Sequence, residues 1–403
     1  MEIRSIKRDE FREYASVWER TFNFDGKDEE LEQEADAHEL DRSIVAVDSD
    51  RFVGTGGSFS FDMTVPGGSV AAAGLTAIAV LPTHRRQGVL TAMMRHHFDD
   101  VREREEPVSI LRASESLIYS RFGYGVSTLD ARWKIRKAEA VLLPGPEGNG
   151  SISMIDVERA RTVLPEVYAS AARSTPGFLS RNESIWKHAF LDLEHWRGGF
   201  TSNRFVVYEE QGRAHGYLRY RVKDTWEQSI PKNEVLAAEL MALTPEAEMA
   251  LWRFVFSMDL IDVVRTQNRP VHELLDVLLA EPRRLEKRRV DGIWTRLVDV
   301  PAALSARRYR VPGRVVFEVV DRFLPDSGGR FALEGSLDGA SCEPTGEEPD
   351  LIVDAGALGA CYIGGGSFEM LRVAGRVEGT REAVRLADTM FSWHVDPWCP
   401  HYF

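Results

Sequence analysis

The sequence predicts a protein of the mixed α/β (α+β) class with more than one domain, and three observations carry this prediction. A chain of 403 residues is long for one hydrophobic core, so two or three domains are expected. Short apolar β-runs alternate with amphipathic helical patterns along most of the chain. Two distant stretches also repeat one plan: an apolar strand, a turn containing proline, and a helix with an apolar face.

The first predicted domain covers residues 1–137. The run RDEFREYASVWERTF places Phe11, Tyr14, Val17 and Trp18 at helical spacing, which predicts an amphipathic helix. The run SIVAVDSDRFVGTGGSFSFDM predicts two strands joined by a tight Asp-Ser-Asp turn, and SVAAAGLTAIAVLP predicts a third strand. A helix and the β-run VSILRAS complete this domain.

The second predicted domain, residues 138–291, begins with the polar connection LLPGPEGNGS. Its segment LAAELMALTPEAEMALWRFV follows the plan of LTAIAVLPTHRRQGVLTAMM in the first domain, which indicates an internal duplication. Glu-Ala-Glu-Met replaces Arg-Arg-Gln-Gly in the second copy, so we expect that domain to lack whatever the arginines bind. Residues 292–403, with β-runs around a PDSGG turn and a final helix, predict a separate small α+β domain.

Composition narrows the class of protein. Hydrophobic residues make up 43% and charged residues 28%, as in ordinary globular proteins. No apolar run approaches the ~20 residues of a membrane span, and the N-terminus lacks the apolar core of a signal peptide, so we expect a cytoplasmic protein. The net charge of −13 argues against nucleic-acid binding. It suits a cationic small substrate, although solubility alone also explains an acidic chain.

Three cysteines, Cys342, Cys361 and Cys399, are widely spaced and form no CxxC pair. This pattern predicts neither a disulfide framework nor a metal site.

The stretch LPTHRRQGVL, residues 81–90, combines a strand end, a turn and a helix start. Unpaired backbone N–H groups and the helix dipole make such a place favourable for an anion. Arg85 and Arg86 add positive charge, and Gly88 lets a ligand approach the backbone closely. Because cations are unfavourable at a helix N-terminus without an anion, the stretch predicts a diphosphate site rather than a solvated helix start.

This stretch, together with ASESLIYSRFGYG at 113–125, resembles the pyrophosphate loop and the tyrosine segment of the GNAT acetyltransferases. Leu90 departs from the pattern, which has Gly or Ala there. The runs AVLPTHRRQGVL, IYSRFGYG and PWC, and the chain length, resemble the enhanced intracellular survival (Eis) acetyltransferases. The resemblance implies two tandem GNAT-like domains, the first with an acetyl-CoA site and the second degenerate, then a sterol-carrier-protein-like domain. It also implies a hexamer.

The resemblance assigns catalytic roles as well. Tyr119 takes the position of the general acid, since a phenol keeps its proton at neutral pH. Burial of Tyr119 in the core is the alternative, and Tyr124 is the other candidate. The C-terminal carboxylate of Phe403 is expected to act as the base or to position a water that does. The aromatic and proline-rich end DPWCPHYF independently predicts a docked tail, because its side chains are costly to leave exposed.

Expected contacts to acetyl-CoA come from the end of a strand, the pyrophosphate loop and the next β-run: Ile78, Ala79, Val80, Arg85, Arg86, Gln87, Gly88, Val89 and Ser114. Backbone amides at the strand end would polarise the thioester oxygen. Ser114 could instead cap the following helix.

The resemblance also implies the acceptor, a small-molecule amine of the polycationic, aminoglycoside-like kind. Phe22, Phe24 and Asp25 would bind its ammonium groups, whereas the glutamates that follow could simply form a solvated helix. Ala77 and Tyr402 replace an aromatic and an acidic residue of some family members, which predicts a shifted or narrower substrate range.

Two other functions stay open. One is acetyl transfer to protein lysines or arylalkylamines. The other is a non-catalytic CoA- or lipid-binding module, in which the C-terminal domain would hold an apolar molecule.

Overall fold

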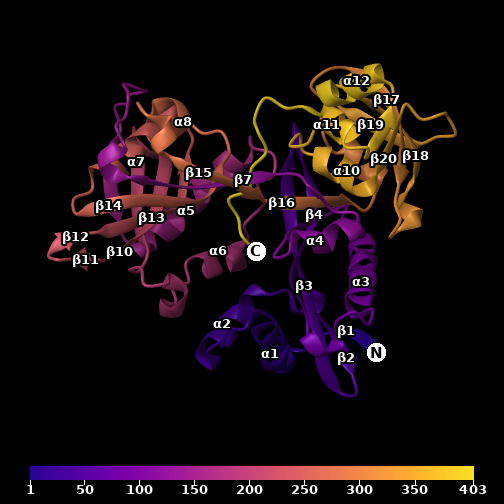
Figure 1. The fold of residues 1–403 in the computed structure, drawn as a ribbon, viewed down its shortest axis with the longest axis horizontal. Coiled ribbons are helices and arrows are strands. Elements are labelled where there is room, and N and C mark those ends of the chain that lie inside the picture. Colours follow the sequence, from indigo (N-terminus) through magenta and orange to yellow (C-terminus); the bar gives the residue numbers. More distant parts are fainter. The chain divides into compact units, whose positions relative to one another are not determined.

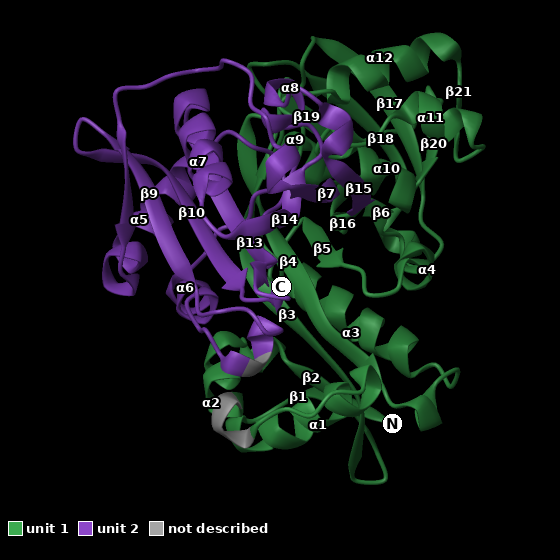
Figure 2. Cartoon of the chain, turned by 60° about the vertical axis from the view of Figure 1, so that its left-hand side comes forward, with its two compact units in different colours: residues 1–128, 291–397, 401–403 green, residues 129–290, 398–400 purple. Residues whose placement is uncertain are grey.

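Three main sheets and their helices make up the fold (Figure 1). The computed structural model describes the backbone of residues 1–403 and every side chain except those of residues 28–30 and 195. The chain forms two compact units (Figure 2). Unit 1 comprises Met1–Thr128, Asp291–Pro397 and His401–Phe403, and unit 2 comprises Leu129–Val290 and Trp398–Pro400. The predicted mixed α/β class is confirmed.

The first sheet has seven strands in the order β1-β2-β3-β4-β5-β16-β6. Their bounds are Glu2–Ser5 (β1), Ile44–Asp48 (β2), Arg51–Val65 (β3), Gly68–Val80 (β4), Val108–Arg112 (β5), Ile293–Leu297 (β16) and Gly125–Val126 (β6). Its helices are α1 (Phe11–Phe22), α2 (Asp28–Ala37), α3 (Val89–Glu103) and α4 (Ser116–Tyr119). The predicted turn between the first two long strands is present, with Ser49 and Asp50 at φ of 51° and 60°, the backbone of a tight hairpin turn.

Helices cover both faces of the first sheet because side chains along each strand alternate in direction. Ile44 and Ala46 of β2 pack with Met93 of α3. Val45, between them, packs with Tyr14 of α1. The helix predicted from the apolar spacing at the N-terminus is therefore α1, and its apolar face is buried.

Strands β4 and β5 begin as parallel partners and then separate. Their pairing runs from Ala72↔Val108 to Leu75↔Leu111. Beyond it, β4 continues to Val80, with an irregularity in its pairing to β3 where Ala77 adopts φ of 51°. A gap therefore opens between the two strand ends, directly before α3.

The second sheet repeats this plan in the order β15-β7-β14-β13-β10-β9-β8. Its strands are Glu286–Asp291 (β15), Leu129–Arg136 (β7), Ile261–Pro270 (β14), Asn233–Ala242 (β13), Arg213–Lys223 (β10), Arg204–Glu210 (β9) and Ser151–Ile155 (β8). Its helices are α5 (Val157–Ala172), α6 (Glu183–Ala189), α7 (Pro245–Ser257) and α8 (Leu275–Leu278), and a short hairpin joins β11 (Trp226–Glu227) to β12 (Ile230–Pro231). The parallel pair β13 and β14, joined through α7, corresponds to β4, α3 and β5.

The third sheet, in unit 1, has the order β19-β18-β17-β20-β21. Its strands are Ala340–Pro344 (β19), Gly329–Gly335 (β18), Gly313–Val320 (β17), Leu351–Asp354 (β20) and Val377–Gly379 (β21). The accompanying helices are α9 (Val300–Ser305), α10 (Ala355–Cys361), α11 (Phe368–Val373) and α12 (Arg381–Phe391).

The structure differs from the predicted domain limits at two strands. Residues 129–136, which the sequence analysis placed in the first domain, form β7 and pair with β14 in the second sheet. Residues 293–297, which it placed in the C-terminal domain, form β16 and pair with β5 in the first sheet. Each of the first two sheets is thus completed by a strand from beyond its predicted limit. Nothing local in a strand specifies which distant sheet it joins, so hydrophobic pattern could not reveal this.

Candidate active site

A cavity of about 400 Å³ lies in unit 1 where β4 and β5 separate. Its lining includes most of the residues predicted to contact acetyl-CoA, together with the predicted acid and one aromatic residue: Ile78, Ala79, Val80, Arg85, Arg86, Gly88, Val89, Ser114, Tyr119 and Phe22. These residues come from β4, the loop before α3, the segment after β5, α4 and the end of α1. One cavity therefore unites residues that the sequence separates by about a hundred positions.

The loop before α3 has the properties of an anion site. Gly88 precedes the helix at φ of 84°, a left-handed conformation that favours glycine, and a Cβ there would meet no described atom within 4 Å. The backbone N–H groups of Arg86 and Gly88 donate no hydrogen bond within the described part of the chain. Arg85 and Arg86 are both exposed, and neither forms an ion pair with a described side chain.

Tyr119 ends α4 and is 5% exposed although it lines the cavity. Burial, followed by the nearby charge of Glu115, raises the pKa of Tyr119 to about 12. The phenol therefore keeps its proton throughout the neutral range, as a proton donor must. Tyr124, the other candidate, is 1% exposed, and its hydroxyl lies 2.7 Å from the hydroxyl of Ser109 in the core.

Four predicted site residues do not line this cavity. Gln87 donates from its side chain to the carbonyl of Thr83 at 3.1 Å, so it braces the loop. Phe24 is 47% exposed and packs edge to face on Trp18. Asp25 is exposed. Phe403 packs elsewhere in unit 1.

The sequence reasoning missed two residues of the lining, His84 and Arg121. Arg121 belongs to the run IYSRFGYG, whose tyrosine was recognised but whose arginine received no role. His84 lies 3.7 Å from the carboxylate of Asp48. Arg121 and the two loop arginines give the cavity a positive character. Glu115 is the one acidic residue of the lining that the structure describes.

The last three residues are docked within unit 1, as the aromatic tail predicted. The ring of Phe403 lies 5.1 Å from that of Phe61, centroid to centroid. A Cβ on Gly74 of β4 would come within 3.1 Å of the Phe403 ring. Arg112, the last residue of β5, donates to the carbonyl of His401 at 2.9 Å and lies over the Tyr402 ring.

Aromatic side chains continue from this docked tail in an unbroken series. Neighbouring ring centroids lie 5.1–6.2 Å apart. The series, which we call the aromatic row, consists of Phe24, Trp18, His38, Phe59, Phe61 and Phe403. Such faces attract organic cations and stack on apolar rings. The glutamates at positions 29 and 30, interpreted as a possible part of the acceptor site, lie outside the described side chains.

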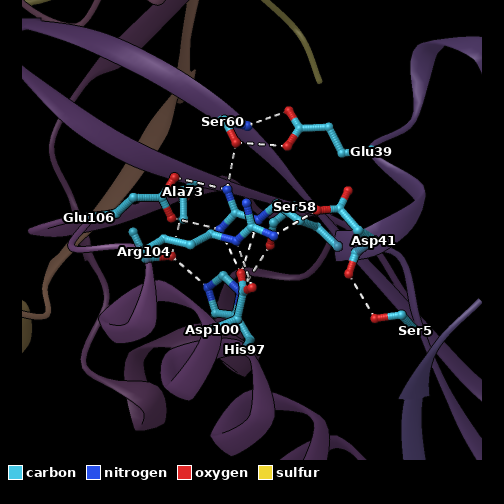
Figure 3. Close-up of polar contacts among 12 residues, drawn as sticks. Ser5, Glu39, Asp41, Ser58, Ser60, Ala73, His97, Asp100, Arg104 and Glu106 are labelled. Atoms are coloured by element: carbon cyan, nitrogen blue, oxygen red, sulfur yellow. Dashed lines mark hydrogen bonds and ion pairs between the residues drawn. The ribbon is translucent and has the colours of Figure 1, made fainter.

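A buried polar network fixes α3 to the first sheet (Figure 3). Arg42, 3% exposed, donates to Asp100 of α3, to Glu106 and to Ser60 of β3 at 2.7–3.0 Å. His97 of α3 lies 3.0 Å from the hydroxyl of Ser58, atom to atom. Charge-assisted hydrogen bonds therefore hold α3, whose first turn forms the anion site, against the first sheet.

No group of three or more His, Cys, Asp or Glu side chains in the described part of the chain could hold a metal ion. Among the described residues, no helix has the length and apolar run needed to cross a lipid bilayer.

Comparisons with known proteins agree with this architecture. Residues 2–127 and residues 177–304 each match a model of an acetyltransferase (GNAT) domain. Residues 300–400 match a sterol carrier protein domain. The fold and these matches define the class: the chain is a GNAT-type N-acetyltransferase with two GNAT domains and a C-terminal sterol-carrier-like domain.

Relatives identify the family within this class. The chain is 42% identical over 407 residues to an uncharacterized N-acetyltransferase of Streptomyces avermitilis, covering 100% of this chain and 99% of the relative. It is 32% identical over 346 residues to the N-acetyltransferase Eis of Mycobacterium tuberculosis, covering 83% and 81%. The crystal structure of Eis1 from Mycobacterium abscessus superposes with a TM-score of 0.87 at 34% identity over 100% of both chains. The chain belongs to the Eis family, as the resemblance predicted.

Proposed function

We propose that the cavity before α3 binds acetyl-CoA and that the chain transfers its acetyl group to amines of small polycationic, aminoglycoside-like molecules. The observation that carries the proposal is the clustering of two unpaired arginines, the Gly88 turn and Tyr119 in one cavity. The loop before α3 suits a diphosphate, because the N–H groups and positive charges of the loop complement an anion. Acetyl-CoA supplies the acetyl thioester.

The chain's own residues would serve the reaction as follows. Arg85, Arg86 and the N-terminus of α3 hold the diphosphate. Along Ile78–Val80, the backbone N–H groups that point away from β3 and toward the gap would stabilise negative charge on the reacting carbonyl oxygen. Tyr119 donates its proton to the leaving thiolate. The carboxylate of Phe403 takes a proton from the amine, directly or through water.

For the acceptor, Phe22, Phe24 and Asp25 provide aromatic faces and a carboxylate at the end of α1. The aromatic row begins at Phe24 and continues through Trp18 and His38. The same row favours a second acceptor class, the arylalkylamines, through ring stacking. Protein lysines are the remaining alternative.

The lipid-binding alternative for the C-terminal domain has less support. The guanidinium of Arg307 lies between the rings of Tyr309 and Phe391, 4.7 Å from each centroid, and donates to the carbonyls of Tyr362 and Phe391. Protein side chains thus fill this part of the interior. A cytoplasmic, hexameric enzyme remains part of the proposal, by analogy with the family.

The test uses purified protein, acetyl-CoA and a panel of aminoglycosides, arylalkylamines and a lysine peptide. Release of free thiol measures turnover, and mass spectrometry counts the acetyl groups gained by each acceptor. We expect acetylated aminoglycosides. Turnover restricted to arylalkylamines or to the peptide would contradict the acceptor class, and no thiol release with any amine would contradict the whole proposal.

A further inference from the structure

Strand β16 carries a buried arginine whose side chain contacts the turn that follows Tyr119. Arg296 is fully buried, and its Nη1 donates to the backbone carbonyl of Phe122. Its guanidinium carbon also lies 4.6 Å from the ring centroid of Phe98 in α3, within the range of a cation–π interaction. A buried guanidinium is costly unless an anion neutralises its charge.

The neutralising anion comes from the C-terminal domain. Asp321 directly follows β17, and its Oδ2 accepts from Nη2 of Arg296. Its Oδ1 accepts from the backbone N–H groups of Phe323 and Leu324 at 2.9 Å and 2.8 Å. Only 2% of the Asp321 side chain is exposed, so water screens these bonds little. One carboxylate thus bonds both to the arginine and to the segment of the C-terminal domain that follows it.

This segment also packs directly against the turn. The ring of Phe323 meets that of Phe122 edge to face, with centroids 4.9 Å apart. It lies 6.0 Å from the ring of Phe98 as well. The C-terminal domain is therefore linked to the turn in two ways: through the ion pair of Asp321 with Arg296, and through an aromatic contact.

The turn itself begins at the proposed proton donor. The carbonyl of Tyr119 accepts from the backbone N–H of Tyr124 at 3.3 Å. The carbonyl of Ser120 accepts from the N–H of Gly123 at 3.1 Å. A Cβ on Gly123 would overlap the guanidinium of Arg296. The arginine thus fills the space beside the turn and bonds to its backbone, so the turn cannot open without losing these contacts.

We infer that Arg296, neutralised by Asp321, is a positioning residue for Tyr119, and that the C-terminal domain contributes to acetyl transfer in this way. A proton donor must lie within hydrogen-bond reach of the leaving group, and a misplacement of about 1 Å costs up to ~10²-fold in rate. The catalytic consequence rests on the proposed function, in which Tyr119 is the general acid. The hold on the turn does not depend on it.

The first experiment measures the hold on the turn without catalysis. Arg296→Lys keeps a positive charge beside Asp321, but lysine lacks the planar fork that bonds to two acceptors at once. Hydrogen exchange followed by mass spectrometry reports on the amides of Gly123 and Tyr124, whose bonds close the turn. We expect these amides to exchange about tenfold faster than in wild type, while peptides of β2 keep the wild-type rate.

The matched control is Arg307→Lys. Arg307 is also a buried arginine of unit 1, and it donates to the backbone carbonyls of Tyr362 and Phe391. Neither acceptor belongs to the turn, so this variant should accelerate exchange around Phe391 and leave the turn at the wild-type rate. Wild-type exchange of the turn in Arg296→Lys, or equal acceleration there in the two variants, would overturn the inference.

A second pair of variants tests the link to the C-terminal domain and leaves Arg296 in place. Asp321→Asn keeps an oxygen for its two backbone partners but turns an amide N–H₂, a second donor, towards the guanidinium. Exchange in the turn should again accelerate. Asp388→Asn is the control, since Asp388 also accepts from two backbone N–H groups in the C-terminal domain. Wild-type exchange of the turn in Asp321→Asn would overturn the role of that domain.

Turnover then tests the consequence for catalysis. Arg296→Lys should lower kcat about tenfold and leave KM for acetyl-CoA within about twofold, because the loop before α3 is unchanged. In a Tyr119→Phe background it should lower kcat no further, since the proton to be positioned is gone. Arg307→Lys should leave kcat near its starting value in both backgrounds. The same fall for Arg296→Lys in both backgrounds, or faster exchange with wild-type kcat, would overturn the positioning role.

The single variant Tyr119→Phe separates this inference from the proposed function. If Tyr119→Phe keeps full activity while Arg296→Lys loosens the turn, the acid assignment fails and the link between Arg296 and the turn stands. If Tyr119→Phe lowers kcat but Arg296→Lys changes neither exchange nor kcat, the inference fails and the proposed function stands.

Discussion

The rings of Phe61 and Phe403 meet edge to face, 5.1 Å apart with an interplanar angle of 61°. This contact holds the last residue of the chain against β3. Strand β3 pairs with β4, whose end lines the cavity. The side chain of the last residue is thus packed in the fold, which is unusual for a chain end.

One glycine added after Phe403 should therefore reduce activity. The addition moves the terminal carboxylate by one residue without removing any buried side chain. We expect kcat to fall about 100-fold, within the range for loss of a general base, while acetyl-CoA affinity and the melting temperature stay at wild-type values. Calorimetric titration and steady-state kinetics check both, and full activity of the extended protein would rule out the carboxylate as base.

Tyr119→Phe should lower kcat by about 10²–10⁴-fold, because it removes only the proposed proton donor. The matched control is Tyr124→Phe. Its lost hydroxyl bonds to Ser109 in the core, so it should cost about 1 kcal/mol of stability with kcat within about twofold. Equal kinetic effects in the two variants would contradict the assignment.

Deprotonation of Tyr119 should not lower the turnover rate of the wild-type enzyme at any pH below about 10. Burial raises the pKa of Tyr119 to about 12, and an acid catalyst loses activity only as pH approaches its pKa. A decline centred near pH 8 that disappears in Tyr119→Phe would contradict this.

Gly88→Ala should weaken acetyl-CoA binding, since the new Cβ stands where the diphosphate would approach the backbone. Gly212→Ala is the control, because Gly212 also has a positive φ, 74°, and open space around a Cβ. Both variants should lose about 1 kcal/mol of stability through left-handed strain. Only Gly88→Ala should raise KM for acetyl-CoA, by about tenfold, as measured by initial rates.

Local features of the fold were predictable from the sequence. The spacing of Phe11, Tyr14 and Val17 predicts α1, and the sequence around Gly88 predicts a turn at a helix start; both depend on neighbours within a few residues. The motif also predicts one side of the cavity, since β4, the loop and α4 follow one another along the chain with only α3 and β5 between them. The end of α1, which completes the lining, comes from about a hundred positions away.

Features that depend on distant contacts were not predictable. The pairing of β16 with β5 joins residues almost two hundred positions apart. Arg269 of β14 donates to Leu240 of β13 and to Glu248 of α7, which only the fold brings beside it. Gln87 matched a motif position, but the loop turns its side chain back to Thr83, which no spacing rule records.

The buried polar network that joins α3 to the first sheet predicts that the folded protein loses stability in mild acid. His97 is 3% exposed, with hydroxyl groups of Ser58 and Ser109 3.0 Å and 2.8 Å from its two ring nitrogens. Burial, and then the charge of Arg42, lowers its pKa to about 3. The unfolded chain binds a proton there near pH 6.5, so the native state loses stability as pH falls from about 6.5 towards 3. The slope approaches about 1.4 kcal/mol per pH unit.

Melting temperatures between pH 8 and pH 5 test this for wild type and His97→Gln. The glutamine variant should be less stable at pH 8, yet its melting temperature should fall less steeply below pH 6.5. Burial also lowers the pKa of His188 in unit 2, so His188→Gln serves as the comparison for a histidine outside the network. Burial raises the pKa of the Glu239 carboxylate, but Arg181 outweighs this effect and lowers it to about 2. In the unfolded chain the same group titrates near 4.3. Such carboxylates therefore change the stability mainly below pH 5, outside the measured range of pH 8 to pH 5. Parallel curves for wild type and His97→Gln would show that His97 takes up its proton in the folded protein.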